Sequence, residues 1–203
     1  MTLGPADAAA FERCIDEGGV AVFPADTVYG LACDPRSPSA VARLYELKGR
    51  EAGKPAAVMF FAVPAALHAM PELGPRTRAA LERMLPGAVT VLLPNPERRF
   101  ALACGPDPDT LGLRVPAMGA FAAIARPVLQ SSANRSGAAD ARRVEDVDEA
   151  LREAADLVLD GGELPGTPST VIDLRGFEAG EWSVVRAGAV AWGALDDVLG
   201  DGS

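Results

Sequence analysis

The stretch GGVAVFPADTVYGL, residues 18–31, combines a helix stop, a short strand and a polar loop in immediate succession. Upstream of it, residues 7–17 mix apolar and charged side chains at helical spacing, and the two glycines that follow are a natural end for that helix. Val20–Phe23 is short, apolar and partly β-branched, as a buried strand is. A proline then breaks the strand, and Asp26 and Thr27 place two polar side chains in the loop. Because binding sites form in loops at strand ends, this loop is a candidate site.

The rest of the chain alternates short apolar runs with helical patterns. Ser37 or Ser39 can cap a helix that presents apolar residues on one face before it ends at Gly49. The continuous apolar runs at 56–63 and 89–93 favour strands buried on both faces. We expect further helices at 77–84 and 144–154, and further strands at 112–115, 128–131, 157–159, 170–174 and 182–185.

This alternation predicts an α/β fold in which helices pack on a mixed, twisted sheet. The chain of 203 residues contains no obvious linker, so we expect one domain over residues 1–203 with a core at about 8–192. Nearly half of the residues are apolar and only 5% are aromatic, which predicts a core of Val, Leu and Ala layers.

Composition also narrows the classes of partner. The formal net charge of -9 argues against charge-driven nucleic-acid binding as the main task and favours small substrates, although a local basic cleft remains compatible with it. Cys14, Cys33 and Cys104 are far apart and His68 is the single histidine, so neither a zinc site nor a disulfide framework is expected. Residues 1–20 lack a secretion signal, and no apolar run approaches the length of a membrane span. We therefore expect a soluble, cytoplasmic protein.

Two cations flank a glycine at the end of the second predicted helix. Lys48 and Arg50 can grip phosphate oxygens through a point charge and a bidentate fork, respectively. Alternatively they are a solvated helix end, where Lys and Arg are common. In both interpretations we expect the two side chains to be exposed.

A second polar cluster follows the predicted strand at 128–131. Ser132, Asn134, Ser136 and Gly137 offer hydroxyl, amide and loop N–H groups that can hold an anion or a nucleotide. The alternative is an ordinary capped turn, because Ser, Asn and Gly are the usual turn residues.

Three further positions are ambiguous on sequence alone. Arg114 lies between apolar neighbours, so it either points inward toward an anionic partner or is an exposed strand residue. Asp26 and Thr27 either orient a substrate or form an Asx-type turn, and the same choice applies to Ser169 and Thr170.

Several common catalytic motifs are absent from the sequence. The chain has no phosphate-loop, dinucleotide-fingerprint or HExxH pattern. His68 has no accompanying Ser or Cys elbow, so we expect a structural or surface role for His68.

Taken together and in order, eight segments of the chain resemble the YrdC/Sua5 family, whose members make threonylcarbamoyl-adenylate for tRNA modification. Each segment is weak alone, but their joint occurrence in this order is highly specific. The segments are GVAVFPADTVYGL (19–31), KGR (48–50), LPGAVT (85–90), LRVP (113–116), SANRSG (132–137), DGG (160–162), PSTV (168–171) and VRAG (185–188).

The resemblance implies a twisted α/β fold around an open, concave cleft, and a nucleotidyltransferase that uses L-threonine, bicarbonate, ATP and Mg²⁺. It implies downstream threonylcarbamoyl-transferase proteins as partners, little or no direct tRNA binding, and no membrane association. By position it assigns catalytic roles to Lys48 and Arg50, and assigns ATP binding to Lys48, Arg50, Thr90, Ser132, Asn134 and Arg186. It assigns L-threonine binding to Thr27, Arg114 and Ser169, and no protein metal ligand. We expect the short, single-domain form of the family.

Three segments depart from the family pattern. Ala25 replaces a threonine, Gly53-Lys54-Pro55-Ala56 replaces a segment that often has His or Asn, and residues 138–142 bring Asp140 into a usually Ser/Thr-rich stretch. Two alternatives therefore stand beside threonylcarbamoyl-adenylate synthesis. One is a related protein that binds nucleotide or RNA without this activity, and the other is an enzyme that adenylates a different carbamate.

Overall fold

The structure, a computed structural model, describes residues 3–49 and 53–200. Within these ranges the strands form one mixed sheet in the order β7-β1-β2-β6-β3-β5-β4-β8-β9. Three pairs are parallel (β1 with β7, β3 with β5, β4 with β8) and the other five are antiparallel. The strands are β1 (Ala21–Pro24), β2 (Tyr29–Cys33), β3 (Ala57–Met59), β4 (Val89–Pro94), β5 (Thr110–Arg114), β6 (Val128–Ser132), β7 (Leu157–Val158), β8 (Thr170–Asp173) and β9 (Ser183–Arg186).

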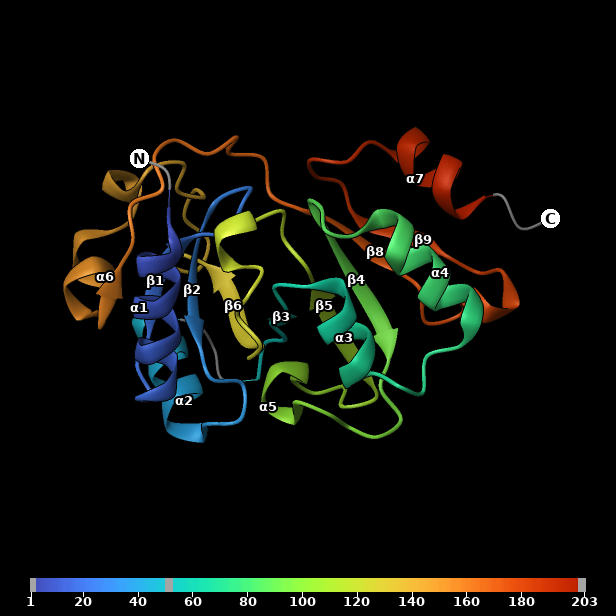
Figure 1. Cartoon of the computed structure of the whole chain (residues 1–203), viewed down its shortest axis with the longest axis horizontal. Helices are drawn as coiled ribbons and strands as arrows, with labels where there is room; N and C mark the ends of the chain where they lie inside the picture. The colour runs from blue at the N-terminus through green and yellow to red at the C-terminus, as the bar shows by residue number, and fades with distance from the viewer. Residues whose placement is uncertain (1–2, 50–52, 201–203) are drawn as a thin grey trace.

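Helices pack along this sheet, and Figure 1 shows α1 lying beside β1 at one end and α4 and α7 near the other end. The α-helices are α1 (Pro5–Asp16), α2 (Pro38–Leu47), α3 (Val63–Ala69), α4 (Pro75–Met84), α5 (Ala101–Cys104), α6 (Glu149–Ala154) and α7 (Trp192–Leu199). Three short 3₁₀ helices are η1 (Gly119–Phe121), η2 (Val144–Asp146) and η3 (Phe177–Ala179). None of the described helices is long and apolar enough to cross a bilayer.

Local sequence signals set several of these boundaries. The Ser37 side chain accepts a hydrogen bond from the Ala40 N–H at 3.3 Å, so Ser37 is the expected cap of α2. Gly18, just after α1, has a φ of +78°, which glycine adopts without strain. The Asp148 side chain caps α6, and the expected helix at 144–154 is therefore divided into η2 and α6.

The expected α/β fold is confirmed, but two of its strands were described wrongly. The run at 56–63 is a strand only over Ala57–Met59, and α3 begins at Val63. The run at 89–93 is not buried on both faces, because its side chains alternate between buried and half-buried positions. Sequence patterns also did not predict β2, α5 or α7 as elements.

The reason for this alternation lies in how the faces of the sheet are covered. Phe11 of α1 and Phe121 of η1 pack on Phe23 and Met59, with the Phe11 and Phe23 ring centroids 4.9 Å apart. Arg114 pairs laterally with Met59 and with Thr90, and laterally paired residues point to the same face of a sheet. The face that carries the Phe11 cluster at one end therefore continues across β3, β5 and β4.

The opposite face is apolar along its length. Val58, Leu113, Val91 and Ile172 point there, on four adjacent strands, and join Leu44 of α2 and other helical side chains in the larger core cluster. With that face covered by helices, the half-buried residues of β4 and β5 face a hollow on the other side, which is the candidate site.

Candidate functional site

A cleft of about 460 Å³ lies on the sheet face described above. Its wall includes side chains or backbone from β3, β4, β5, β6, β8 and β9 and from the loop after β1. The cleft contains six of the residues assigned from the sequence, although they come from segments far apart in the chain. These residues are Thr27, Thr90, Arg114, Ser132, Ser169 and Arg186.

Arg114 is the most constrained of these residues. It is only 3% exposed, so the inward-pointing interpretation of this strand arginine is the one observed. Its terminal nitrogen donates to the Ala25 carbonyl oxygen at 3.1 Å, to the Thr27 hydroxyl at 2.8 Å and to the Asp26 carboxylate. Burial lowers the pKa of the guanidinium, and the Asp26 charge opposes that effect. Because the Arg114 Nε is buried with no partner among the described residues, the guanidinium retains an unused donor.

Asp26 contacts Arg114 but does not line the cleft; it lines a neighbouring hollow whose wall also includes Thr27 and Ala117. Its φ of +60° is in the left-handed region, which costs a non-glycine residue about 1 kcal/mol. The second carboxylate oxygen accepts a hydrogen bond from the Ala117 N–H at 3.1 Å. Burial raises the pKa of Asp26 above its ordinary value, and the Arg114 charge works in the opposite direction.

Hydroxyl groups and an arginine form the opposite wall of the cleft. Thr90 Oγ1 lies 2.8 Å from Ser169 Oγ. Arg186 donates to the Ser169 carbonyl oxygen at 2.8 Å and contacts its hydroxyl at 3.4 Å. Arg186 therefore contacts a neutral residue, whereas Arg114 contacts a carboxylate.

Lys48 does not point into the cleft as an exposed cation. It is 2% exposed, so the expectation of an exposed side chain was wrong. Its ammonium group donates to the Ser132 carbonyl oxygen, to the Asn134 carbonyl oxygen at 2.8 Å and to the Asn134 side-chain oxygen at 3.1 Å. Lys48 thus fastens the end of α2 to the loop that presents Ser132. Arg50 lies outside the described residues.

Ser132 and Asn134 are joined to one another, because the Ser132 hydroxyl donates to the Asn134 side-chain oxygen at 2.6 Å. The Ser136 N–H also donates to the Lys48 carbonyl oxygen at 3.0 Å. This cluster is therefore more than an isolated turn. The buried Lys48 ammonium holds it through hydrogen bonds, and Ser132 lines the cleft.

The departures from the family pattern fall in different places. Ala25 is fully buried in the cluster with Phe23 and Phe121 and is not part of the cleft wall, so the hydroxyl lost there does not face the cleft. Asp140, in contrast, lines the cleft and adds a negative charge to it. His68 is exposed on α3 and lies outside this wall.

Sequence reasoning missed the residues at the far end of the cleft. Cys104, Asp107 and Arg175 line it, and Arg175 contacts the Thr110 hydroxyl at 3.1 Å. No local motif marks them, because they reach this wall through the loop between β4 and β5 and the turn after β8.

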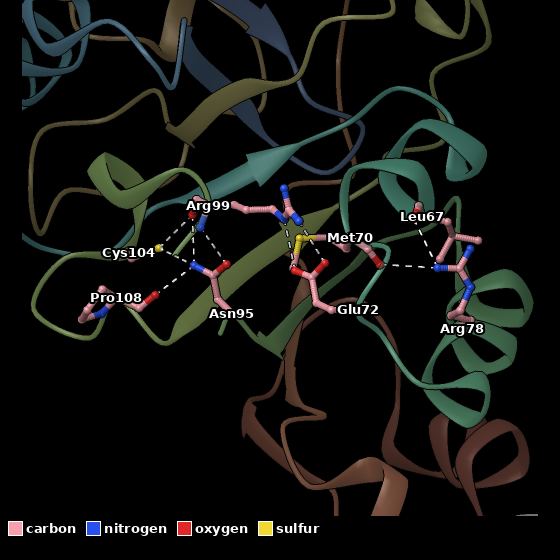
Figure 2. Close-up of polar contacts among 8 residues, drawn as sticks. All are labelled: Leu67, Met70, Glu72, Arg78, Asn95, Arg99, Cys104 and Pro108. Atoms are coloured by element: carbon pink, nitrogen blue, oxygen red, sulfur yellow. Dashed lines mark hydrogen bonds and ion pairs between the residues drawn. The ribbon is translucent and has the colours of Figure 1, made fainter. Parts of the chain in front are cut away.

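A buried amide holds the first of these segments in shape. Asn95, which is fully buried, donates to the carbonyl oxygens of Arg99 at 3.0 Å and Pro108 at 2.9 Å, and accepts from the Arg99 N–H at 2.9 Å. Arg99 pairs in turn with Glu72, and Figure 2 shows this network beside Cys104. The loop that forms the far wall is therefore fixed by side-chain hydrogen bonds.

Fold and site together define a class: an α/β protein with an open cleft that contains three arginines and several hydroxyl groups, suited to small anionic ligands. The chain belongs to the Sua5/YciO/YrdC family, because the family model described as "Telomere recombination" matches residues 13–188.

Two curated relatives and one solved structure illustrate the similarity. The threonylcarbamoyl-AMP synthase of Pyrococcus abyssi is 31% identical over 194 residues, which cover 92% of this chain and 55% of that protein. The threonylcarbamoyl-AMP synthase of Thiobacillus denitrificans is 36% identical over 174 residues, covering 77% of this chain and 85% of that protein. The crystal structure of P. abyssi Sua5 complexed with L-threonine superposes with a TM-score of 0.82 at 27% identity, covering 99% of this chain and 59% of that one. The chain thus spans little more than half of the Pyrococcus protein.

Proposed function

We propose that this chain makes L-threonylcarbamoyl-adenylate from L-threonine, bicarbonate and ATP, with release of pyrophosphate, for N6-threonylcarbamoyladenosine modification of tRNA. The observation that supports this most directly is that Thr27, Arg114 and Ser169 share one cleft with Ser132 and Arg186. The first three are the proposed threonine contacts and the last two are proposed ATP contacts. The names of the curated relatives support the same reaction.

In this proposal the amino acid binds at the Arg114 end of the cleft. Its carboxylate has a suitable partner in a buried guanidinium that holds an unused donor. Thr27 and Ser169 supply hydroxyl groups for the polar atoms of the substrate. Closely spaced donors of this kind fix the orientation of the reacting amine relative to the nucleotide.

The chemistry requires no covalent intermediate with the protein. The threonine amine loses a proton and condenses with bicarbonate, releasing water and giving a carbamate. A carbamate oxygen then attacks the α-phosphorus of ATP, and the bond between the α-phosphorus and the bridging oxygen breaks as pyrophosphate leaves. Negative charge builds on the phosphoryl and leaving groups, so positioned cations and N–H or O–H donors supply most of the catalysis.

The residues present fit a bound triphosphate. Arg186 and Ser132 offer charged and neutral donors on the cleft wall, and Lys48 and Asn134 support the Ser132 loop. We retain Arg50 and Thr90 as proposed ATP contacts. Arg50 remains a proposed catalytic residue, whereas Lys48, which does not line the cleft, is proposed to position the Ser132 loop.

Magnesium would be held chiefly by the phosphates. Among residues 3–49 and 53–200, no group of three or more His, Cys, Asp or Glu side chains is placed to hold a metal ion. Mg²⁺ in nucleotide enzymes is usually held by substrate phosphates, waters and one or two carboxylates, and Asp140 is a carboxylate in the cleft wall. When bound, the ion would neutralise charge on the phosphates.

The proposal extends to the cellular context. It takes residues 1–203 as one YrdC-like domain, supported by the single sheet, and places the protein in the cytoplasm. The adenylate would pass to a threonylcarbamoyl-transferase protein, since an acyl phosphate of this kind hydrolyses readily. The chain itself would bind tRNA weakly or not at all, consistent with its net charge of -9.

A pyrophosphate-release assay tests the reaction directly. The protein is incubated with ATP, Mg²⁺ and bicarbonate, with and without L-threonine, and the adenylate is identified by mass spectrometry. We expect release that depends on both threonine and bicarbonate. Release only with another amine would favour the alternative carbamate, and nucleotide binding without any release would favour a non-catalytic protein.

A further inference from the structure

Asp26 lines a hollow next to the cleft, and Thr27 lines both. Asp26 does not line the cleft, but its carboxylate contacts the guanidinium of Arg114, which does. The other carboxylate oxygen is held by the Ala117 N–H at 3.1 Å. The carboxylate is therefore fixed on one side by backbone and on the other by the arginine.

The backbone of this loop is shaped around the same contact. The left-handed conformation of Asp26 turns three consecutive residues toward one nitrogen of Arg114. That nitrogen donates to the carbonyl oxygen of Ala25, the carboxylate of Asp26 and the hydroxyl of Thr27. With one nitrogen held by all three acceptors, the guanidinium has little freedom to rotate, and its Nε remains without a partner among the described residues.

The three arginines of the cleft differ in electrostatic surroundings. Arg114 and Arg175 are paired with carboxylates, whereas Arg186 contacts the neutral Ser169. Arg114 and Arg186 are linked through two residues, because Arg114 pairs laterally with Thr90, Thr90 bonds Ser169, and Arg186 contacts Ser169. The Arg186 charge accordingly adds to the lowering of the Arg114 pKa by burial. A polyanionic triphosphate is attracted more strongly to Arg186 than to Arg114, because the Asp26 carboxylate partly neutralises the Arg114 charge. Arg114 is then left to bind the single carboxylate of the amino acid.

We propose that Asp26 is a positioning and specificity residue for the amino-acid substrate, which acts through Arg114 without touching the substrate. It orients the guanidinium toward the substrate carboxylate and reduces the attraction of this arginine for phosphate. This inference rests on the proposed function. A buried ion pair by itself adds little net stability compared with apolar packing, so stability alone is a weak reason for the arrangement.

The variant Asp26→Asn isolates the charge. Asparagine adopts the left-handed conformation readily, and its side-chain oxygen can still accept from the Ala117 N–H. The matched control is Asp34→Asn, which alters a turn aspartate that accepts from the Arg36 N–H at 2.8 Å and does not line the cleft. Kd values for L-threonine and for ATP are measured separately by calorimetry, with melting temperatures and the KM and kcat of the full reaction.

We expect Asp26→Asn to weaken threonine binding about tenfold or more, as loss of a charge-assisted contact does, with an equal or lower Kd for ATP. A purely structural role would instead weaken both ligands together with the melting temperature. The double variant Asp26→Asn/Arg114→Lys should bind threonine little more weakly than Arg114→Lys alone, because Asp26 acts only through the Arg114 guanidinium. The Asp34→Asn control should match the wild type.

The outcomes separate this inference from the proposed function. If the wild-type protein binds ATP but neither binds nor uses threonine, the proposed function fails and this inference fails with it. If the wild type uses threonine and folded Asp26→Asn has an unchanged threonine Kd, only the role of Asp26 is overturned. Should Asp26→Asn fail to fold, Asp26→Gly removes the carboxylate at a position where glycine relieves the backbone strain, and the same threonine-selective loss is required of it.

Discussion

Thr90 and Ser169 are joined by a direct hydrogen bond of 2.8 Å between their hydroxyl groups, although 79 residues separate them in the sequence. The parallel pairing of β4 with β8 brings them together, since Val89 lies beside Thr170 and Thr90 beside Val171. Thr90 is a proposed ATP contact and Ser169 a proposed threonine contact. The bond therefore links the two halves of the proposed substrate site.

Replacement of Thr90 by valine tests this link. Thr90→Val keeps the shape of the side chain and removes the hydroxyl that orients Ser169. We expect kcat/KM for threonine to fall about five- to tenfold, the usual effect of one lost hydrogen bond. Steady-state kinetics with varied threonine measures this effect.

The matched control lies next to Ser169. The Thr170 hydroxyl bonds the Val190 carbonyl oxygen at 2.8 Å and accepts from the Val190 N–H at 2.9 Å. Because these bonds are buried and outside the cleft, Thr170→Val should lower the free energy of unfolding by about 1–3 kcal/mol and leave KM unchanged. Equal kinetic losses in both variants would contradict the role given to Thr90.

Lys48→Met is expected to lower both activity and stability. The substitution leaves the carbonyl oxygens of Ser132 and Asn134 without their buried donor, so we expect the free energy of unfolding to fall by about 2–4 kcal/mol. Urea denaturation measures this change. Arg13→Met, at an exposed position of α1, should change it by less than about 0.5 kcal/mol. A fully stable but inactive Lys48→Met protein would show that the contacts to the loop add no stability.

Removal of the Asp140 charge should improve nucleotide binding. Asp140 lines the cleft, and its carboxylate repels a triphosphate. If Mg²⁺ does not use this carboxylate, Asp140→Asn should lower the Kd for ATP about two- to fivefold, and the gain should shrink at high salt because the charges are screened. A higher Kd that appears only when Mg²⁺ is present would identify Asp140 as a carboxylate that supports the ion instead. Calorimetric titrations with and without Mg²⁺ distinguish these results.

The stability of the fold at alkaline pH should depend on Tyr29. Burial raises the pKa of Tyr29 to about 12, while its hydroxyl donates to the Gly162 carbonyl oxygen at 2.9 Å and accepts from the Gly161 N–H at 3.0 Å. A tyrosine in the unfolded chain ionises near pH 10, so the unfolded state loses its proton first as the pH rises. The stabilising contribution is therefore complete below about pH 10 and declines between about pH 10 and pH 12.

Denaturation curves measured across this range check the expectation. Tyr29→Phe should be less stable at neutral pH, because the Gly162 carbonyl oxygen and the Gly161 N–H both lose the hydroxyl as a partner. The free energy of unfolding of this variant should also fall less steeply above pH 10. The protein has two tyrosines, so in a Tyr45→Phe variant the alkaline absorbance change reports Tyr29 alone, and it should occur well above pH 10. Ionisation of Tyr29 near pH 10 in that folded variant would contradict the burial argument.

Sequence alone determined the α/β class, most helix and strand positions and six of the residues that line the candidate site. The class and the element positions follow from local patterns. Each depends on local chemistry: Ser37 caps a helix because its side chain reaches a nearby N–H, and the apolar stretch before Pro24 forms a strand. The assignment of Thr27, Thr90, Arg114, Ser132, Ser169 and Arg186 relied on the joint order of eight short segments, and the structure brings these six residues to one cleft.

Tertiary structure alone decided which face of the sheet stays open and which side chains are buried. Leu92 and Val91 are both apolar, yet only Leu92 faces the cleft, since the helices cover the other face. Lys48 is buried and Asp26 meets Arg114 because strand pairing brings distant segments together. Periodicity within one segment carries no information about the groups that another segment will place against it. That is the physical reason why the ordered segments identified six cleft residues while the contacts between those residues could not be predicted.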